Sequence, residues 1–345
     1  MKLFVTGVEG YLGCLLAPVL MARGHEVTGF DTGYYRDGWL FSNRTLVPRF
    51  PRFINGDIRE IQPEHLHGID AVVHLAELSN DPLGENDPEL TFQINHQASV
   101  RLAAMAKAAG VKRFVYTSSC SVYGVADGAE PMTELSPVNP LTAYAKCKTL
   151  VERDVAAMAS PDFAPTFLRN ATAYGASPRM RFDIVLNNLC GVAATAGRIA
   201  MTSDGTPWRP LVHALDICEA IACVLDASQD RIHAEVFNVG HDADNYQVRE
   251  IAQIVANVYP GCELSFGPSG GDNRSYRVSF AKIHERLPDF HCAWDARKGA
   301  RQLHDVFERI GMDRATFEGR AFTRLKQLKY LSATGQVDER LFWRY

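Results

Sequence analysis

Residues 117–124, TSSCSVYG, are rich in hydroxyl groups, and a tyrosine and a lysine follow them at helical spacing. Tyr144 and Lys148, in YAKCK, are four residues apart, which places both side chains on one face of a helix. A free tyrosine titrates near ~10, so it needs a neighbouring positive charge to act as a base at neutral pH. Lys148 supplies such a charge, and a serine hydroxyl at the end of the strand expected at 112–118 is suited to holding a substrate oxygen in line with the base. This set of groups favours removal of a proton from an alcohol while a hydride leaves its carbon.

A second candidate site is a glycine-rich turn near the start of the chain. VTGVEGYLG spaces Gly7, Gly10 and Gly13 as G-x-x-G-x-x-G, directly after an expected strand and at the start of an expected helix. Glycines in this position let backbone N–H groups approach a pyrophosphate, and the helix N-terminus favours negative charge. Asp31 ends the second expected strand, where a carboxylate accepts from both ribose hydroxyls and repels a 2′-phosphate. The pattern favours NAD over NADP, although Arg36 lies nearby and an aspartate here could also serve as an N-cap or turn residue.

The elements that must position these groups alternate between strands and helices over the first half of the chain. Such alternation predicts βαβ units, a parallel sheet and helices on both faces, which is an α/β doubly wound Rossmann fold. Strands are expected at 2–6, 25–31, 52–57, 70–76, 112–118 and 164–170, and helices at 11–24, 89–110 and 143–159.

The second half of the chain contains more glycine, proline and polar loops, which predicts a smaller C-terminal substrate-binding lobe. Residues 1–170 are expected to form the NAD-binding domain, to which 210–240 return, and residues 171–323 most of the lobe. Clear elements in the second half are a helix at 215–227, a strand at 235–240 and a helix at 245–258. The tail, 324–345, has an amphipathic helical pattern up to Gly335 and is expected to dock as a terminal helix.

Composition excludes several classes of protein. The chain of 345 residues has a net charge of −4 and no block of like charge, so it carries no electrostatic footprint for a nucleic-acid partner. No apolar run approaches the ~18 residues that a membrane span requires. The eight cysteines form no C-x-x-C pair and most stand in apolar stretches, which predicts free thiols, no metal site and a cytoplasmic location.

Several motifs together resemble one family, the extended short-chain dehydrogenases/reductases, and within it the NAD-dependent nucleotide-sugar epimerase/dehydratase group. The similarity follows the expected order along the chain, through TGVEGYLG, HLAELSN, INHQAS, YTSSCSVYG, YAKCK, LRNATAYG, DGTPWRPLVHALDI and EVFNVG. The resemblance implies NAD as cofactor, a nucleotide-diphosphate sugar as substrate, and a homodimer formed through the helices at 89–110 and 143–159.

The resemblance also assigns roles residue by residue. It implies that Ser119, Tyr144 and Lys148 are catalytic. The implied cofactor contacts are Gly7, Gly10, Tyr11, Leu12, Gly13, Asp31, Asp57, Ile58, Leu75, Ala76, Asn95, Tyr144 and Lys148. The implied substrate contacts are Ser119, Cys120, Ser121, Thr172, Asn188, Arg209 and Arg274. Several of these assignments have a competing interpretation. Asp57 could be a plain turn residue, and Asn95 could be an amide bonded to backbone. Each arginine could form a surface ion pair. Asn187 competes with Asn188 for its role.

The type of reaction depends on two neighbouring positions. Dehydrating relatives typically carry Asp and Glu directly after the catalytic Ser or Thr, whereas this chain has Cys120 and Ser121. Without those acids, oxidation and reduction at one sugar carbon remain. The favoured hypothesis is an epimerase acting at C4 through a 4-keto intermediate, and the alternative is an NAD(P)H-dependent reductase of 4-keto sugars. A 4,6-dehydratase and a non-catalytic dinucleotide-binding protein are further alternatives.

Two features depart from the family pattern. The family sequence HLAA is HLAE here, so Glu77 has no assigned role and could point at the sugar. Thr172 resembles the threonine of UDP-glucuronate 4-epimerases, where following arginines hold a carboxylate. Arg179 and Arg181 could do so here, which is the basis for the hypothesis of a uronate substrate. The loop spacing differs from that of those epimerases, and this weakens the hypothesis.

Overall fold

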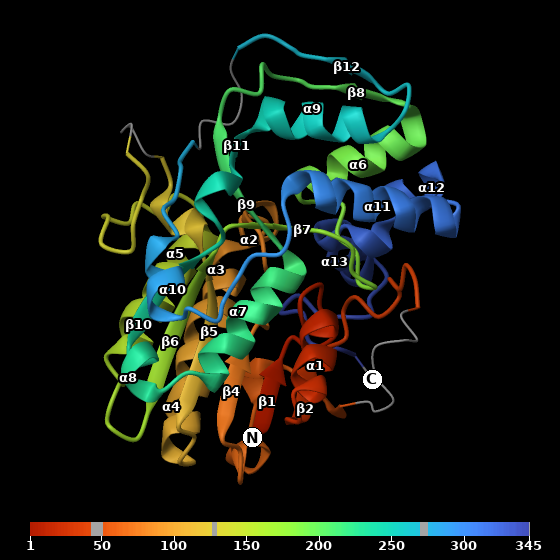
Figure 1. Ribbon diagram of the computed structural model, residues 1–345. Helices are drawn as coiled ribbons and strands as arrows, with labels where there is room; N and C mark the ends of the chain where they lie inside the picture. Colours follow the sequence, from red (N-terminus) through yellow and green to blue (C-terminus); the bar gives the residue numbers. More distant parts are fainter. Residues whose placement is uncertain (43–50, 126–129, 270–274, 345) are drawn as a thin grey trace.

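A seven-stranded parallel sheet forms the centre of the computed structural model, which describes residues 1–42, 51–125, 130–269 and 275–344 (Figure 1). The strands follow the spatial order β10 (Glu235–Val239), β6 (Ala164–Asn170), β5 (Arg113–Ser119), β4 (Ala71–His74), β1 (Lys2–Thr6), β2 (Glu26–Asp31) and β3 (Arg52–Asn55). The order reverses between β4 and β1, where Thr6 pairs with His74. A crevice outside the carboxyl ends of strands is expected at such a switch point.

Helices cover both faces of this sheet. On one face α1 (Gly13–Ala22) and α7 (Ala214–Asp226) pack in one hydrophobic core with Leu3 and Val5 of β1. On the other face α4 (Ala98–Ala108) and α5 (Ala143–Ala156) belong to a second core with Phe4. Alternate residues of β1 therefore face opposite layers, as the pleat of a strand requires. The predicted doubly wound α/β fold is confirmed.

The long helix expected at 89–110 is divided into three parts, a difference from the prediction. It consists of α3 (Pro88–Thr91), a π-helical turn η3 (Phe92–Gln97) and α4. Asn95 lies inside the π-helical turn with 0% exposure, and its amide is bonded to both backbone groups of Leu78. The wider turn thus accommodates a polar side chain that anchors the segment after β4.

A second group of elements stands above the carboxyl ends of the central strands in Figure 1. It contains the helices α6 (Val185–Ala196), α9 (Val248–Val258), α11 (Ala296–Ile310) and α12 (Arg314–Glu318) and the paired strands β8 (Arg198–Ala200) and β12 (Glu263–Ser265). A three-stranded sheet of β7 (Thr172–Tyr174), β9 (Trp208–His213) and β11 (Asn245–Gln247) joins this group to the rest. The division of the chain at residues 170 and 323 stays a prediction.

The helix expected at 245–258 starts three residues later than predicted. Residues 245–247 instead form β11, which pairs antiparallel with β9. Gln247 then caps α9 in a reciprocal arrangement with Glu250, which explains why the helix begins at Val248. The remaining short helices are α2 (Asp81–Gly84), α8 (Gln229–Ile232) and α10 (Ala281–Arg286). Short 3₁₀ turns lie at Ile58–Glu60, Pro63–Leu66, Cys120–Tyr123, Asp242–Asp244 and Arg320–Phe322.

The C-terminal segment returns to the N-terminal part of the sheet. Helix α13 (Arg324–Ala333), dark blue in Figure 1, buries Leu328 and Leu331 in the same core as Phe4 and Phe30. The chain beyond it makes an isolated bridge between Val337 and Trp343. The tail is therefore packed against the sheet along its described length.

All eight cysteines are free thiols, and none of the helices in the described residues is both long and apolar enough to cross a lipid bilayer.

Candidate active site

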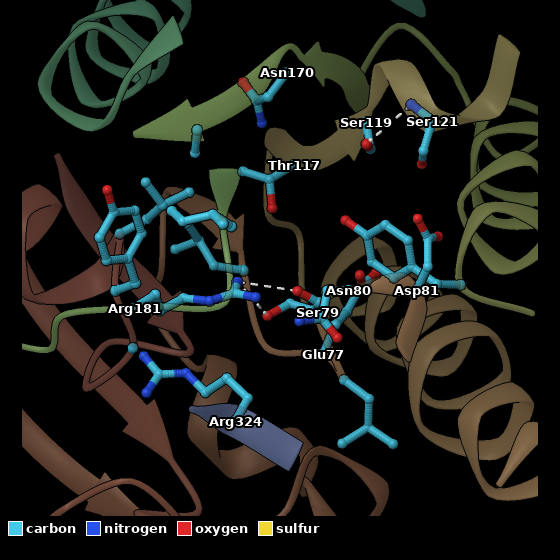
Figure 2. Close-up of a pocket in the computed structure, with 18 of the residues that line it drawn as sticks. Glu77, Ser79, Asn80, Asp81, Thr117, Ser119, Ser121, Asn170, Arg181 and Arg324 are labelled. Carbon is cyan, nitrogen blue, oxygen red and sulfur yellow. Dashed lines mark hydrogen bonds between the residues drawn. The ribbon is translucent and has the colours of Figure 1, made fainter. Parts of the chain in front are cut away.

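A cavity of about 570 Å³ opens at the carboxyl ends of β1, β2, β4 and β5, under the second group of elements. Figure 2 shows side chains from distant parts of the chain converging on it, from Glu77 and Thr117 to Arg181 and Arg324. Its size and its place at the switch point of the sheet are those expected for a dinucleotide and a second ligand.

The glycine turn lines one end of the cavity and accepts only glycine at two positions. Gly7 has φ +71°, and a Cβ there would lie 2.8 Å from the backbone nitrogen of Ala76. A Cβ on Gly13 would lie 2.2 Å from the carbonyl oxygen of Gly7. The backbone is thus as close as a diphosphate cradle requires, and the start of α1 faces the cavity.

Asp31 is hydrogen-bonded to the glycine turn and can accept further hydrogen bonds. Its Oδ1 accepts from Gly33 N at 2.8 Å and its Oδ2 from Glu9 N at 3.0 Å. A carboxylate has about four lone-pair positions, so two stay available for ribose hydroxyls. Arg36 donates to Glu9 Oε2 at 2.8 Å and to Asn55, so its charge is already engaged. This arrangement fits NAD better than NADP.

Asp57 lines the cavity, but most of its bonding is internal. Its Oδ1 accepts from the Arg59 backbone at 2.8 Å, and the Arg59 guanidinium lies 2.6 Å from Oδ2. The residue caps the short turn at Ile58–Glu60. The turn interpretation therefore accounts for its bonds, and its contact with adenine stays a prediction.

Ser119, Tyr144 and Lys148 meet at the other end of the cavity, since β5 ends at Ser119 beside the first turns of α5. Ser119 Oγ accepts from Ser121 N at 3.1 Å, and Ser119 lies close enough to Tyr144 to lower the pKa of the phenol. The Lys148 ammonium lies 5.3 Å from the centre of the Tyr144 ring and donates to the Thr117 carbonyl. The helical spacing predicted for Tyr144 and Lys148 is present.

Glu77 makes a buried ion pair with Lys148. Its Oε2 lies 2.5 Å from Lys148 Nζ, and its Oε1 accepts from the Tyr116 hydroxyl at 2.5 Å. The side chains of Glu77 and Lys148 are 2% and 4% exposed. The glutamate that departs from the family pattern therefore engages the lysine of the site.

At this end of the cavity, burial and the neighbouring charges have opposing effects on the pKa values of the side chains. Burial raises the pKa of Tyr144, Lys148 opposes the rise, and Glu77 adds to it. Burial opposes the charged form of Lys148, but Glu77 and Tyr144, with a smaller effect of Glu152, together outweigh it, so the pKa of the lysine is raised. Burial also raises the pKa of Glu77, against the effect of Lys148. The tyrosine thus needs a further positive charge nearby to act as a base at neutral pH.

Most of the other predicted residues line the cavity. Of the expected cofactor contacts these are Gly10, Tyr11, Leu12, Ile58, Leu75 and Ala76, and of the expected substrate contacts they are Ser121, Thr172 and Arg209. The Ser121 hydroxyl is buried and has no hydrogen-bond partner among the described residues, which leaves it available to a ligand. Arg274 lies outside the described residues.

Three predicted contacts are not found in the cavity lining. Cys120 is 1% exposed and donates its thiol to the Arg169 carbonyl, because β5 turns into a 3₁₀ helix at this residue. Asn188 faces outward from α6 and donates to the Phe182 carbonyl at 2.9 Å, and its competitor Asn187 is buried against Gly175. Asn95 anchors Leu78, which agrees with its competing interpretation.

The two arginines of the uronate hypothesis are already bonded. Arg179 Nη1 donates to the carbonyls of Tyr35, Arg36 and Gly38 and does not line the cavity. Arg181 lines it but pairs with Asp183 at 2.8 Å. Neither is free to hold a substrate carboxylate.

Sequence reasoning missed three parts of the lining. Asn80 and Asp183 join two loops by a hydrogen bond of 2.8 Å, and Asp81 accepts from Thr142. Tyr35 and Arg324 also line the cavity. No local pattern marks Arg324, because its role depends on where α13 packs.

A parallel doubly wound sheet with a glycine turn at its switch point defines a dinucleotide-binding α/β enzyme. Residues 3–240 match the model of the NAD dependent epimerase/dehydratase family, and the chain belongs to this family. NAD is its cofactor, as the sequence predicted.

Relatives agree with this assignment. The chain is 32% identical over 276 residues to a UDP-glucose 4-epimerase of Corynebacterium glutamicum, covering 75% of this chain and 80% of that protein. It is similar to MoeE5, solved with UDP-glucose and NAD, with a TM-score of 0.74 and 27% identity over 90% of this chain and 99% of MoeE5. It also resembles DesIV, a dTDP-glucose 4,6-dehydratase from Streptomyces venezuelae solved with NAD, with a TM-score of 0.76 and 25% identity over 92% of this chain and 100% of DesIV.

Proposed function

We propose that this enzyme is an NAD-dependent nucleotide-sugar epimerase that inverts C4 of its sugar. The observation that carries the proposal is the meeting of Ser119, Tyr144 and Lys148 in one cavity while the next residue, Cys120, is turned away from it. Of the two positions at which dehydrating relatives carry acids, Cys120 therefore contributes no group to the site, and Ser121 contributes a hydroxyl instead of a carboxyl group. Alcohol oxidation and its reversal remain as the chemistry.

The residues divide the work as follows. Bound NAD would supply the hydride acceptor, and then the hydride donor, that oxidation of the sugar carbon and its reversal require. Ser119 holds the sugar hydroxyl, and Tyr144 Oη takes its proton and later gives it back. Lys148, held by Glu77 and the Thr117 carbonyl, keeps a positive charge beside the phenol. Arg209 and Ser121 bind the nucleotide-sugar in the same cavity, which Thr172 also lines.

The test is the cofactor content of the purified protein, followed by turnover of a nucleotide-sugar panel without added cofactor. An epimerase should hold close to one NAD per chain and interconvert UDP-glucose and UDP-galactose unaided. An enzyme that is empty and turns over 4-keto sugars only with added NADH or NADPH would be a reductase, and the proposal would be wrong. Loss of water from the sugar would identify a dehydratase, and no turnover a binding protein.

We also propose a cytoplasmic homodimer. Eight free thiols support a reducing compartment. The resemblance suggests pairing through α3, η3, α4 and α5, although much of the apolar stripe of α4, including Leu102 and Ala106, already packs on its own sheet. Light scattering coupled to gel filtration should give twice the monomer mass of 38.2 kDa, and the monomer mass would contradict the proposal.

A further inference from the structure

Arg324 is a buried cation with no acidic partner in the part of the chain that the structure describes. It is the first residue of α13, is 2% exposed and lines the cavity. Its one hydrogen bond within the described residues is from Nη2 to the Arg179 carbonyl at 3.2 Å, and it forms no ion pair with any of their carboxylates. Its guanidinium lies 4.1 Å from the centre of the Tyr35 ring. Burying such a charge is costly unless something compensates it.

The surroundings of Arg324 add positive charge. Burial lowers the pKa of Arg324 to about 10, and the Arg181 guanidinium adds to this effect. In Figure 2 both arginine side chains extend into the same region of the cavity, and dashed lines connect Arg181 to Ser79. Because Arg181 is paired with Asp183 and Arg324 is not, the region has an excess of positive charge that an anion would neutralise.

A second unpartnered donor lies beside Arg324. The Tyr35 hydroxyl is buried, lines the same cavity and has no hydrogen-bond partner among the described residues. Burial raises the pKa of Tyr35 to about 12, so its proton is present at neutral pH and is available to an acceptor. Two donors that the protein itself does not satisfy indicate a ligand that accepts hydrogen bonds.

The position of the two donors selects the ligand. Arg324 is close enough to influence the titration of Cys14, in the first turn of α1. Arg179, which accepts from Arg324, has Nη2 3.8 Å from Glu9 of the glycine turn. Arg324 is therefore connected through Arg179 to the glycine turn and lines the same cavity as Gly10 and Gly13, at the start of α1, where helix geometry favours a phosphate.

The rest of the tail is bonded to the segments that follow β2 and β3. Gln327 Nε2 donates to the Tyr34 carbonyl at 3.0 Å, and Trp343 Nε1 donates to the Thr32 carbonyl at 2.7 Å. The Tyr34 hydroxyl donates to the Leu341 carbonyl, and the Arg59 guanidinium stacks 3.8 Å from the Phe342 ring centre. These segments carry Asp31 and Asp57, at the end of the cavity expected for adenosine.

We propose that the C-terminal tail is part of the cofactor site, in which Arg324 and Tyr35 bind the diphosphate of the dinucleotide and residues 327–343 hold the adenosine end closed. Arg324 supplies a charge-assisted, forked donor to the phosphate oxygens, and Tyr35 a neutral one. The proposal concerns retention of NAD and is independent of which reaction the enzyme performs.

The test compares Arg324→Gln with Lys329→Gln, which removes the same charge from an exposed position of the same helix. The measured quantity is the exchange of bound NAD for labelled NAD in the purified holoenzyme, and UDP binding is measured by calorimetry. Loss of a charge-assisted bond to phosphate should accelerate exchange about 10- to 100-fold, with UDP affinity unchanged. Lys329→Gln should match the parent protein, and Arg324→Lys should give an intermediate rate.

Unchanged exchange in Arg324→Gln would overturn the proposal, as would weaker UDP binding with normal exchange, which would assign Arg324 to the diphosphate of the substrate. If Arg324→Gln does not fold by circular dichroism, Tyr35→Phe decides the question. Its hydroxyl has no partner in the described protein, so the fold should be kept while NAD exchange rises about 3- to 10-fold. Normal exchange in that variant would then count against the site.

Discussion

Two of the buried cations that line the cavity have opposite surroundings, Lys148 at the end proposed for the reaction and Arg324 at the end proposed for the diphosphate. Lys148 Nζ lies 2.5 Å from a Glu77 oxygen, whereas Arg324, within the described residues, has only a carbonyl and an aromatic face. The lysine and its glutamate together carry no net charge, while the arginine keeps its own.

This difference assigns the reaction to one end of the cavity and the retention of NAD to the other. At the reacting end a neutral pair leaves the protonation of Tyr144 sensitive to any further charge that enters, including the positive charge of oxidised nicotinamide. At the diphosphate end an unpaired charge provides affinity for a permanent anion. Variants at the first end should therefore change turnover, and variants at the second should change NAD exchange.

Tyr144→Phe should have the largest effect on turnover. Without the phenol there is no group to take the sugar proton, so kcat should fall about 10³-fold. Epimerisation assays should show the loss, and NAD exchange should stay within about two-fold of the parent protein. If the variant instead loses NAD, Tyr144 contributes to NAD binding, and the proposed difference between the two ends of the cavity is wrong.

Lys148→Met should reduce turnover about 10²-fold and also destabilise the protein. The substitution leaves the Glu77 carboxylate buried without its cation, at a cost of about 3–5 kcal/mol in the free energy of unfolding. Urea denaturation of the single variant and of the double variant with Glu77→Gln measures the coupling. The double variant should recover most of the stability, and simple additivity of the two losses would contradict a direct ion pair.

Glu77→Gln should shift the pH profile rather than remove activity. The negative charge of Glu77 raises the pKa of Tyr144, so its removal lowers that pKa. Since the base is active above its pKa, the acidic limb of kcat/KM should move about one unit to lower pH. Tyr116→Phe, which removes a bond to Glu77 but no charge, is the matched control. A limb that stays in place in Glu77→Gln would show that the glutamate has only a structural role.

Ser121→Ala should have the smallest effect. Its hydroxyl is buried without a partner among the described residues, so its loss costs the fold little. If it binds the sugar, KM should rise about five-fold with kcat and NAD exchange unchanged. An unchanged KM would exclude Ser121 from the substrate side of the cavity.

The fold and the cofactor turn were predictable because their signals are local. Gly7 and Gly13 are fixed by steric contacts within one turn and with the neighbouring strand, and the spacing of Tyr144 and Lys148 is fixed by the helix. Motifs of this kind can be recognised in a sequence because they do not depend on how distant parts of the chain pack.

The residues that were misjudged depend on packing over long distances. Cys120 follows Ser119 directly, but the 3₁₀ turn rotates its thiol toward β6. Glu77 was visible as a departure from the family, although its partner, 71 residues away, was not. Arg324 lines the cavity only because α13 packs back on the first strands, and no sequence period encodes that return.

The stacking of Arg324 on Tyr35 also has a consequence for the timing of assembly. Tyr35 is synthesised soon after the second strand, whereas Arg324 is synthesised only after almost the whole chain has been made. A contact of such high sequence separation forms late, because the intervening loop must first be closed. A nascent chain can thus fold its central sheet without the full diphosphate site, so we expect NAD to be loaded firmly only after synthesis has passed α13.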